Sequence, residues 1–289
     1  MGQSLVLPVS LMGIRQFSTS LFYIWRIEHP NKGGALVRHL LWQARKLGGK
    51  RPISRRLSQS VLTDDEQGDV ISSVNMLGVY DFNNMSFVKL VLENGGAFID
   101  VGANIGSYTL IASECEKATV LSIEPNPTAF KKLQRNISQN ARGNVIAINA
   151  AASSRAGVLV MTNEGGSSTN RIVSGSAPPT AIEVNADTLD ALCSAHGITP
   201  KLIKIDVEGH EPDVLGGAEV CLRQALAVIV ENGERSTVRE TMTKASMKGP
   251  FYYDHRRRSL SRRTQRWPED AIYIGLTFES DCPDIGVAE

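Results

Sequence analysis

The chain has 289 residues, of which 42% are hydrophobic and 21% charged, so it can bury the core of one large domain. Its formal net charge of +1 excludes the strong overall positive field of a protein that binds nucleic acid through bulk charge. The four cysteines form no CxxC pair, which disfavours a zinc cluster or a disulfide framework and fits the reducing cytoplasm.

The N-terminal part of the chain predicts an extension in front of the main domain. The apolar run 5–14 is too short to span a membrane and lacks the basic flank of a signal peptide, so no transmembrane segment is expected. Helices are expected over 35–47 and 82–93, with short extended pieces over 61–80. We therefore expect a mainly helical extension over 1–92, acting as a cap or a dimer surface, and an α/β domain over 93–289.

From residue 97 onward, short apolar runs alternate with amphipathic segments. The predicted strands span 97–101, 119–124, 144–151, 157–161, 181–185, 201–207, 225–231 and 270–275, and the predicted helices 127–140, 187–196 (capped by Asp187) and 211–223. This alternation is typical of a mostly parallel sheet with helices on both faces. Ligands of such sheets bind beyond the carboxyl ends of the strands, which here fall after Val101, Glu124, Ala151, Val207 and Glu231.

A glycine-rich turn follows the first of these strands, in the sequence Asp100-Val-Gly-Ala-Asn-Ile-Gly106. Glycines let the backbone approach a ligand closely, and the next helix offers free N–H groups. A dinucleotide fingerprint would carry a second glycine where Asn104 stands. Asp100 would repel a pyrophosphate but attract an ammonium group, so the turn favours a methionine-like ligand.

Glu124 ends the second strand, about 20 residues beyond the glycine turn, and is followed by Pro125 and Asn126. A carboxylate at this position can accept hydrogen bonds from both hydroxyls of a ribose. Nicotinamide dinucleotides and S-adenosylmethionine both carry such a ribose, so Glu124 alone leaves the two cofactors open.

The segment Lys204-Ile-Asp-Val-Glu-Gly-His-Glu211 brings several ionisable residues to the end of a buried strand. Alternation along a strand would place Lys204, Asp206 and Glu208 on one face. Charged groups there are expensive to bury unless they are paired or used, so an acid–base cluster with His210 at the rim of the ligand site is predicted. These residue types also bind metals, but their spacing compels no metal site and we assign none.

Taken together, the blocks FIDVGANIGSYT (98–109), IEPNP (123–127), LIKIDVEGHE (202–211) and VIVEN (228–232) resemble the FkbM family of methyltransferases, over roughly residues 77–232. The resemblance implies a Rossmann-like methyltransferase fold, S-adenosylmethionine as methyl donor, and O-methylation of a sugar, glycolipid or natural-product hydroxyl. The chain departs from the family where Ser153-Ser-Arg155 replaces the acid that often follows the third strand.

Carried onto this sequence, the resemblance implies a cofactor site, and the chemistry of methyl transfer adds candidate catalytic residues. The expected cofactor-binding residues are Asp100, Gly102, Asn104, Gly106, Tyr108, Thr109, Glu124, Pro125, Asn126, Ser153 and Asp206. Methyl transfer to a hydroxyl needs positioning and a base. Glu208 and His210 are the candidate bases, and Asp206 is expected to orient the acceptor or stabilise the sulfonium.

The nature of the acceptor stays open at this level. The arginines from Arg256 to Arg266 predict either a grip on a phosphate-bearing substrate or a solvated loop. Trp25, Trp42 and Tyr80 are candidates for sugar stacking, or for core packing. Three alternatives compete with the methyltransferase: a nicotinamide-dependent oxidoreductase, a non-catalytic cofactor-binding scaffold, and a nucleic-acid methyltransferase, which has only the arginine run in its support, so no nucleic acid is expected.

Overall fold

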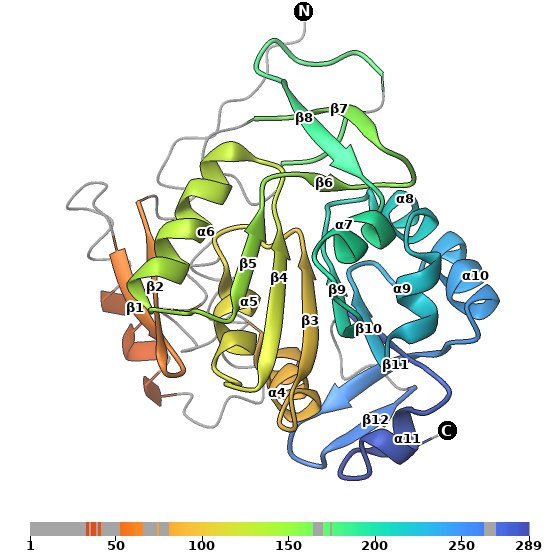
Figure 1. Ribbon diagram of the computed structural model, residues 1–289. Coiled ribbons are helices and arrows are strands. Elements are labelled where there is room, and N and C mark those ends of the chain that lie inside the picture. Colours follow the sequence, from red (N-terminus) through yellow and green to blue (C-terminus); the bar gives the residue numbers. More distant parts are fainter. Residues whose placement is uncertain are drawn as a thin grey trace, which may run out of the picture.

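The structure is a computed structural model of the full chain (Figure 1). It describes residues 53–65, 81–163, 170–173, 175–262 and 270–288, together with 33, 34, 36–38, 40, 41 and 74. Within these residues, no helix has the length and apolar character needed to cross a membrane. Much of the helix predicted over 35–47, and the residues Trp25, Trp42 and Tyr80, lie outside the described residues.

A nine-stranded sheet forms the centre of the molecule, in the order β14-β12-β11-β13-β10-β9-β3-β4-β5. Its strands are β3 (Gly96–Val101), β4 (Ala118–Ile123), β5 (Val145–Ile148), β9 (Pro200–Ile205), β10 (Ala227–Val230), β11 (Lys248–Asp254), β12 (Ser259–Ser261), β13 (Ala271–Ile274) and β14 (Gly286–Ala288). The five strands from β5 to β10 are parallel, and β13 is antiparallel to both of its neighbours. The α/β, mostly parallel arrangement predicted from the sequence is confirmed.

Helices cover both faces of this sheet, because successive side chains of each strand point to opposite faces. On one face Phe98 packs in a cluster with side chains of α4 (Phe82–Val91) and α5 (Ser107–Ser113). On the other face Ile99 packs with side chains of α7 (Leu189–Ala195), α8 (Glu211–Gly216), α9 (Glu219–Gln224) and α10 (Ser236–Lys244). The remaining described helices are α6 (Pro127–Gln139) and α11 (Phe278–Asp281).

The chain order places a switch point between β3 and β9. From β3 the chain runs to β4 and β5 on one side, and it returns to β9 and β10 on the other. The loops that follow β3 and β9 therefore diverge and leave a crevice at the carboxyl edge of the sheet, which is where ligands of open α/β sheets bind.

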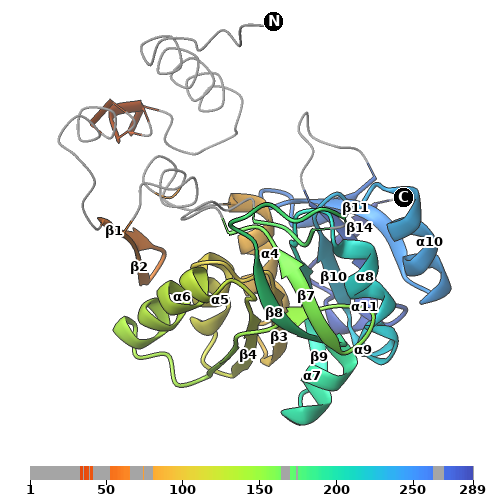
Figure 2. The same cartoon turned by 90° about the horizontal axis from the view of Figure 1, so that it is seen from above.

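A small separate sheet stands over this edge, formed by β6 (Ala151–Ala152), β7 (Gly157–Met161) and β8 (Ile182–Asp187) in the order β6-β8-β7. It lies at the top of Figure 1, and Figure 2, which looks down from that side, shows it over the ends of the main strands. The predicted strands 157–161 and 181–185 thus exist, but they belong to this sheet.

Three boundaries predicted from the sequence are wrong. The third parallel strand ends at Ile148 rather than Ala151, because the chain turns away there into the small sheet. Thr188, not Asp187, caps α7, since its side chain accepts a hydrogen bond from the Ala191 N–H. The helix predicted over 211–223 is two helices, which are separated at Gly217, where the backbone passes so close to Ser153 that a Cβ atom would lie 2.0 Å from its carbonyl oxygen.

The described N-terminal elements pack against the main domain. The hairpin of β1 (Ile53–Leu57) and β2 (Ser60–Asp64) buries apolar side chains in the same core cluster as α4 and α5. Its backbone is held by α6, where the Asn136 amide accepts from the Thr63 N–H at 2.9 Å and donates to the Thr63 carbonyl at 3.0 Å. The division of the chain at residues 92 and 93 stays a prediction.

Candidate active site

A pocket lies at the carboxyl ends of β3, β4 and β9, below the small sheet, and encloses about 980 Å³ of space that opens to solvent. Ten of the residues singled out from the sequence line it: Asp100, Gly102, Asn104, Tyr108, Glu124, Pro125, Asn126, Asp206, Glu208 and His210. The structure therefore gathers most of the predicted site around one cavity.

The glycine turn is shaped by close packing against the end of β9. Gly102 has φ +81°, and a Cβ atom there would lie 1.9 Å from the Asp206 carbonyl oxygen. Only glycine avoids both the strained conformation and this clash. Asn104 also has positive φ, at +51°, which asparagine tolerates better than most residues. The glycine turn after β3 is thus packed closely against the loop after β9 at the switch point.

Glu124 is buried, and its carboxylate is held by the backbone. One oxygen accepts from the Asn104 N–H and the other from the Asn126 N–H, both at 2.8 Å. Burial raises the pKa of Glu124 to about 7, although the two backbone hydrogen bonds act against the rise. Since each carboxylate oxygen can accept a second hydrogen bond, Glu124 still has capacity for two hydroxyl groups of a ligand.

Asp100 lies in a buried network of charged and polar groups at the floor of the pocket. Its carboxylate accepts a hydrogen bond from the Thr109 hydroxyl at 2.6 Å, and burial raises its pKa while Lys204 on the adjacent strand lowers it. The Lys204 ammonium lies 2.6 Å from Asp206 and 4.6 Å from the centre of the Tyr108 ring. Burial lowers the pKa of Lys204, but nearby carboxylates, chiefly Asp206, raise it above its ordinary value, so this lysine is a fixed cation.

Three predicted cofactor residues do not line the pocket. A side chain at Gly106 would meet Leu133, so this glycine serves the packing of the following helix against α6. Thr109 is fully buried and acts through its hydrogen bonds to Asp100 and to Ser122. Ser153 is buried and lies 3.1 Å from the His210 ring. All three support residues of the site rather than face the cavity.

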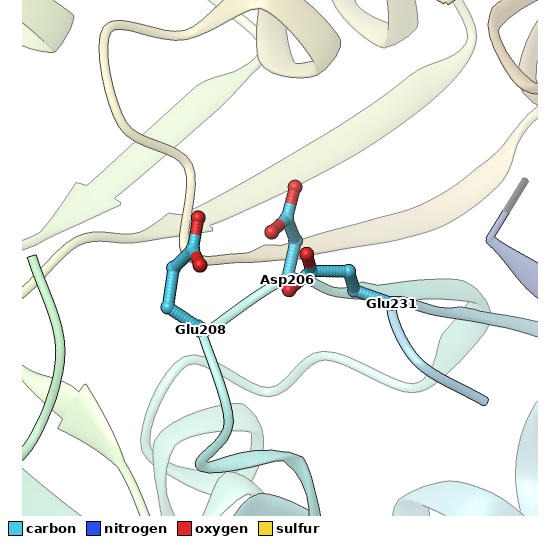
Figure 3. Close-up of side chains that lie close together, drawn as sticks. All are labelled: Asp206, Glu208 and Glu231. Carbon is cyan, nitrogen blue, oxygen red and sulfur yellow. The ribbon is translucent and has the colours of Figure 1, made fainter. Parts of the chain in front are cut away.

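Three carboxylates meet where β9 and β10 end: Asp206, Glu208 and Glu231 (Figure 3). One oxygen of each lies within 4.8 Å of the others, and each residue is partly buried. Burial raises the pKa of Glu231 to about 8, with Asp206 and Glu208 adding to the rise, and one Glu231 oxygen has no hydrogen-bond partner among the described residues. Oxygen clusters of this kind can bind divalent cations, but acidic residues also gather without one, and the cluster alone assigns no metal.

The face alternation predicted for Lys204, Asp206 and Glu208 is wrong as stated, because β9 ends at Ile205. Asp206 and Glu208 lie in the following loop, where Glu208 has φ +52°. This turn nevertheless directs the Glu208 carboxylate toward that of Asp206, as Figure 3 shows. The loop, rather than strand pleating, brings the acids together.

His210 lies on the side of the pocket nearest Ser153. Its Nε2 atom is 3.1 Å from the Ser153 hydroxyl, and its Nδ1 atom is 3.4 Å from Asp213. Burial lowers the pKa of His210, while Asp213 and Glu211 raise it. Both ring nitrogens are therefore engaged with protein groups, unlike the carboxylate of Glu208.

The pocket also contains residues that the motif analysis did not single out as site residues. An arm after β7, which includes residues 170–173, lines the pocket with Asn170, Arg171 and Ile172, and β7 itself contributes Met161. Ala151 and Ala152 line it from β6. A bridge between Met161 and Ile172 closes the arm. The only sequence signal for this arm is the strand 157–161, and the pairing that turns Arg171 and Ile172 toward the pocket is tertiary.

The arginine-rich segment is described as far as Arg262, within the hairpin of β11 and β12. Arg256, Arg257 and Arg258 are exposed, and Arg257 pairs with Asp254 at 2.8 Å. The hairpin rests on the start of α4, where His255 Nδ1 lies 2.6 Å from the Asn83 side-chain oxygen. Residues 263–269 lie outside the described residues, and binding of a phosphate by this segment stays a prediction.

Comparison with known proteins decides the family. The model of the FkbM methyltransferase domain matches residues 100–266, more than half of the chain, and this range spans the glycine turn, Glu124 and the acidic loop after β9. The chain belongs to the FkbM methyltransferase family. Its cofactor is accordingly S-adenosylmethionine, and the nicotinamide-dependent oxidoreductase that Glu124 left open is excluded.

Individual proteins are similar to this FkbM family member at low to moderate sequence identity. A hexuronic acid methyltransferase of Haloferax volcanii, AglP, is 35% identical over 149 residues, which is 50% of this chain and 60% of that protein. The chain thus covers less than two thirds of that relative's length. Two solved structures are similar to this chain, both with a TM-score of 0.43. The first is a methyltransferase from Agrobacterium tumefaciens (12% identity, covering 67% of this chain and 58% of that one). The second is a tRNA (uracil-54, C5)-methyltransferase from Pyrococcus abyssi in complex with S-adenosyl-L-homocysteine (13% identity, covering 78% and 44%).

The pocket residues fit the cofactor of the FkbM family. Glu124 has free acceptor capacity for the two ribose hydroxyls, and Asp100 offers a negative charge for the ammonium group of the methionine part. Apolar lining suited to the adenine ring comes from Ile123, Ala151, Ala152, Met161 and Ile172. Asn104, rather than the second glycine of a dinucleotide fingerprint, lines the pocket after β3.

Proposed function

We propose that the chain transfers the methyl group of S-adenosylmethionine to a hydroxyl oxygen of a sugar. The observation that carries this proposal is the group of carboxylates of Asp206, Glu208 and Glu231, which stands beside the cofactor pocket with unused hydrogen-bond acceptors. Sugars present several hydroxyl donors in a small volume, and carboxylates are suited to bind them. The name of the Haloferax relative, a hexuronic acid methyltransferase, supports an acceptor of this class.

When bound, S-adenosylmethionine supplies an electrophilic methyl group on a sulfonium. The part of the chain at the ends of β3 and β4 holds it: Glu124 accepts from the ribose hydroxyls, and Asp100 attracts the ammonium group. Both carboxylates are already fixed by protein donors, so little side-chain ordering is left for binding. This arrangement leaves the region after β9 for the acceptor.

Glu208 accepts the proton of the attacking hydroxyl in this proposal. Its carboxylate lines the pocket and makes no hydrogen bond to the described residues, whereas both nitrogens of His210 already face Ser153 and Asp213. Burial raises the pKa of Glu208, and Asp206 and Glu211 add to the rise, which makes it a stronger base than an ordinary glutamate. Of the two candidate bases, Glu208 is therefore favoured.

Asp206 acts as a positioning group. Its carboxylate is held by the buried Lys204 ammonium at 2.6 Å, so it keeps one orientation. An oxygen of Asp206 that does not face Lys204 can accept a hydrogen bond from a second sugar hydroxyl. Two neighbouring hydroxyls held by Asp206 and Glu208 would fix the sugar ring for in-line attack. Such positioning of the reactants lowers the barrier to methyl transfer.

The proposal is tested by incubating the full chain with methyl-labelled S-adenosylmethionine and a panel of glycosides containing neutral hexoses and hexuronic acids. We expect label in at least one sugar, and we expect it to survive mild alkali, because an ether is stable under conditions that hydrolyse a methyl ester. Label released by alkali would contradict transfer to a hydroxyl. Binding of S-adenosylhomocysteine without transfer to any sugar would favour a scaffold that has kept only the cofactor site.

A further inference from the structure

One arm of the small sheet carries a cation over the pocket. After β7 the chain returns through residues 170–173, where Val173 donates to the Val160 carbonyl at 2.8 Å. Arg171 is held between these contacts: its carbonyl accepts from the Thr162 N–H at 2.9 Å, and its own N–H donates to the Thr162 hydroxyl at 3.0 Å. The backbone at Arg171 is therefore fixed as the second strand of a short ladder.

The surroundings of Arg171 are acidic. Among the described residues that line the pocket, the acids are Asp100, Glu124, Asp206 and Glu208, and the permanent cations are Lys204 and Arg171. Lys204 is buried and committed to Asp206 at 2.6 Å. Arg171 is exposed, and within the described part of the chain its guanidinium makes no hydrogen bond or ion pair.

Arg171 and Glu208 line the same pocket, and the two side chains interact electrostatically. Burial raises the pKa of Glu208, and Asp206 and Glu211 raise it further, while the positive charge of Arg171 opposes the rise. An anionic ligand near Glu208 would meet repulsion from the carboxylates of the floor and attraction from this one guanidinium. The planar fork of an arginine matches a carboxylate with two parallel hydrogen bonds.

We propose that the Arg171 guanidinium binds the carboxylate of a uronic acid acceptor and thereby selects acidic sugars over neutral hexoses. This inference rests on the proposed function, since it assigns the substrate class of the same site. The sugar hydroxyls then lie toward Asp206 and Glu208, and the sugar carboxylate lies toward the arm, away from the acids of the floor.

The test compares two acceptors that differ in one group, the methyl glycosides of glucuronic acid and of glucose, on wild type, Arg171→Gln, Arg171→Lys and a control, Arg223→Gln. Arg223 is an exposed arginine of α9 that pairs with Glu219 and does not line the pocket. We expect Arg171→Gln to lower kcat/KM for the glucuronide about 10- to 100-fold more than kcat/KM for the glucoside, the range of a charge-assisted hydrogen bond. Arg171→Lys should restore part of the loss.

Calorimetry completes the experiment, because it does not depend on turnover. Glucuronate is titrated into the complex with S-adenosylhomocysteine, and we expect binding that Arg171→Gln removes and Arg223→Gln keeps. An equal loss on both glycosides, or a weaker affinity of Arg171→Gln for S-adenosylhomocysteine, would overturn the inference and make Arg171 a structural or cofactor residue. If glucuronate binds through Arg171 but no sugar is methylated, the proposed function fails and the acidic-ligand site stands.

Discussion

The acids at the ends of β3 and β4 are fixed by protein donors, whereas two of the three acids at the ends of β9 and β10 are not. Glu124 accepts two backbone N–H groups and Asp100 accepts a threonine hydroxyl. Glu208 has no hydrogen-bond partner among the described residues, and one buried oxygen of Glu231 has none. The first region is ready to bind one fixed ligand, and the second keeps free acceptors for a ligand that must be deprotonated.

Because of this difference, the first region suits cofactor binding and the second suits proton transfer. A site organised in advance loses little free energy on binding, which suits a cofactor that every turnover uses. Unpaired carboxylates raise one another's pKa and retain proton affinity, which suits a base. A substitution among the acids of the first region should therefore change cofactor binding, and one among the acids of the second region should change the chemical step.

The largest effect is expected from Gly102→Ala. A Cβ atom would lie 1.9 Å from the Asp206 carbonyl oxygen at a position with φ +81°, so the loops after β3 and β9 must separate. We expect stability to fall by about 3 kcal/mol or more and binding of S-adenosylhomocysteine to be lost. Thermal unfolding and calorimetry measure both quantities. Gly143→Ala is the matched control, since no atom lies within 4 Å of its Cβ position; equal behaviour of the two variants would refute the packing role of Gly102.

Glu208→Gln should separate catalysis from cofactor binding. Removing a general base lowers the rate by about 10²- to 10⁴-fold, and we expect this loss in kcat with an unchanged affinity for S-adenosylhomocysteine. Glu183→Gln, on an exposed position of β8, serves as control. If the variant kept its kcat, His210 would become the favoured base.

The dependence of the reaction rate on pH is a second test of Glu208 as the base. The base must be ionised to accept a proton, and the pKa of Glu208 is raised by burial and by neighbouring acids. At saturating S-adenosylmethionine, kcat should therefore fall as pH decreases, with a midpoint above the ordinary pKa of a glutamate, and this acid limb should be absent from the residual activity of Glu208→Gln. A profile with the same acid limb in both proteins would assign the limb to another group.

A smaller effect is expected from Thr109→Val, which tests the supporting network of the cofactor region. The Thr109 hydroxyl is fully buried, donates to Asp100 at 2.6 Å and lies 2.7 Å from the Ser122 hydroxyl. Leaving Asp100 without this donor should lower the free energy of unfolding by about 1–3 kcal/mol, measured by urea denaturation. The exposed Thr237→Val on α10 should change it little, and an equal change in both variants would contradict the network.

Residues in the cofactor region could be predicted from the sequence because their roles depend on short contiguous motifs at strand ends. Asp100, Asn104 and Glu124 lie where the strand–turn–helix order places them, and all three line the pocket. Arg171 could not be predicted, since its place depends on the bridge between Met161 and Ile172, which is a tertiary contact. The break after α8 likewise lies at a tertiary contact, where Gly217 closely approaches the Ser153 backbone.

The separation of the two regions is tested most directly by titrating S-adenosylhomocysteine into wild type, Glu124→Gln and Glu208→Gln. We expect Glu124→Gln to weaken binding about 10- to 100-fold, since glutamine replaces one acceptor oxygen by a donor, and Glu208→Gln to bind as wild type. Because the pKa of Glu124 is about 7, wild-type affinity should also decline as pH falls through that value, and Glu124→Gln should lack this dependence. Normal binding by Glu124→Gln together with loss of binding by Glu208→Gln would contradict the assignment of the cofactor to β3 and β4 and of the acceptor to β9 and β10.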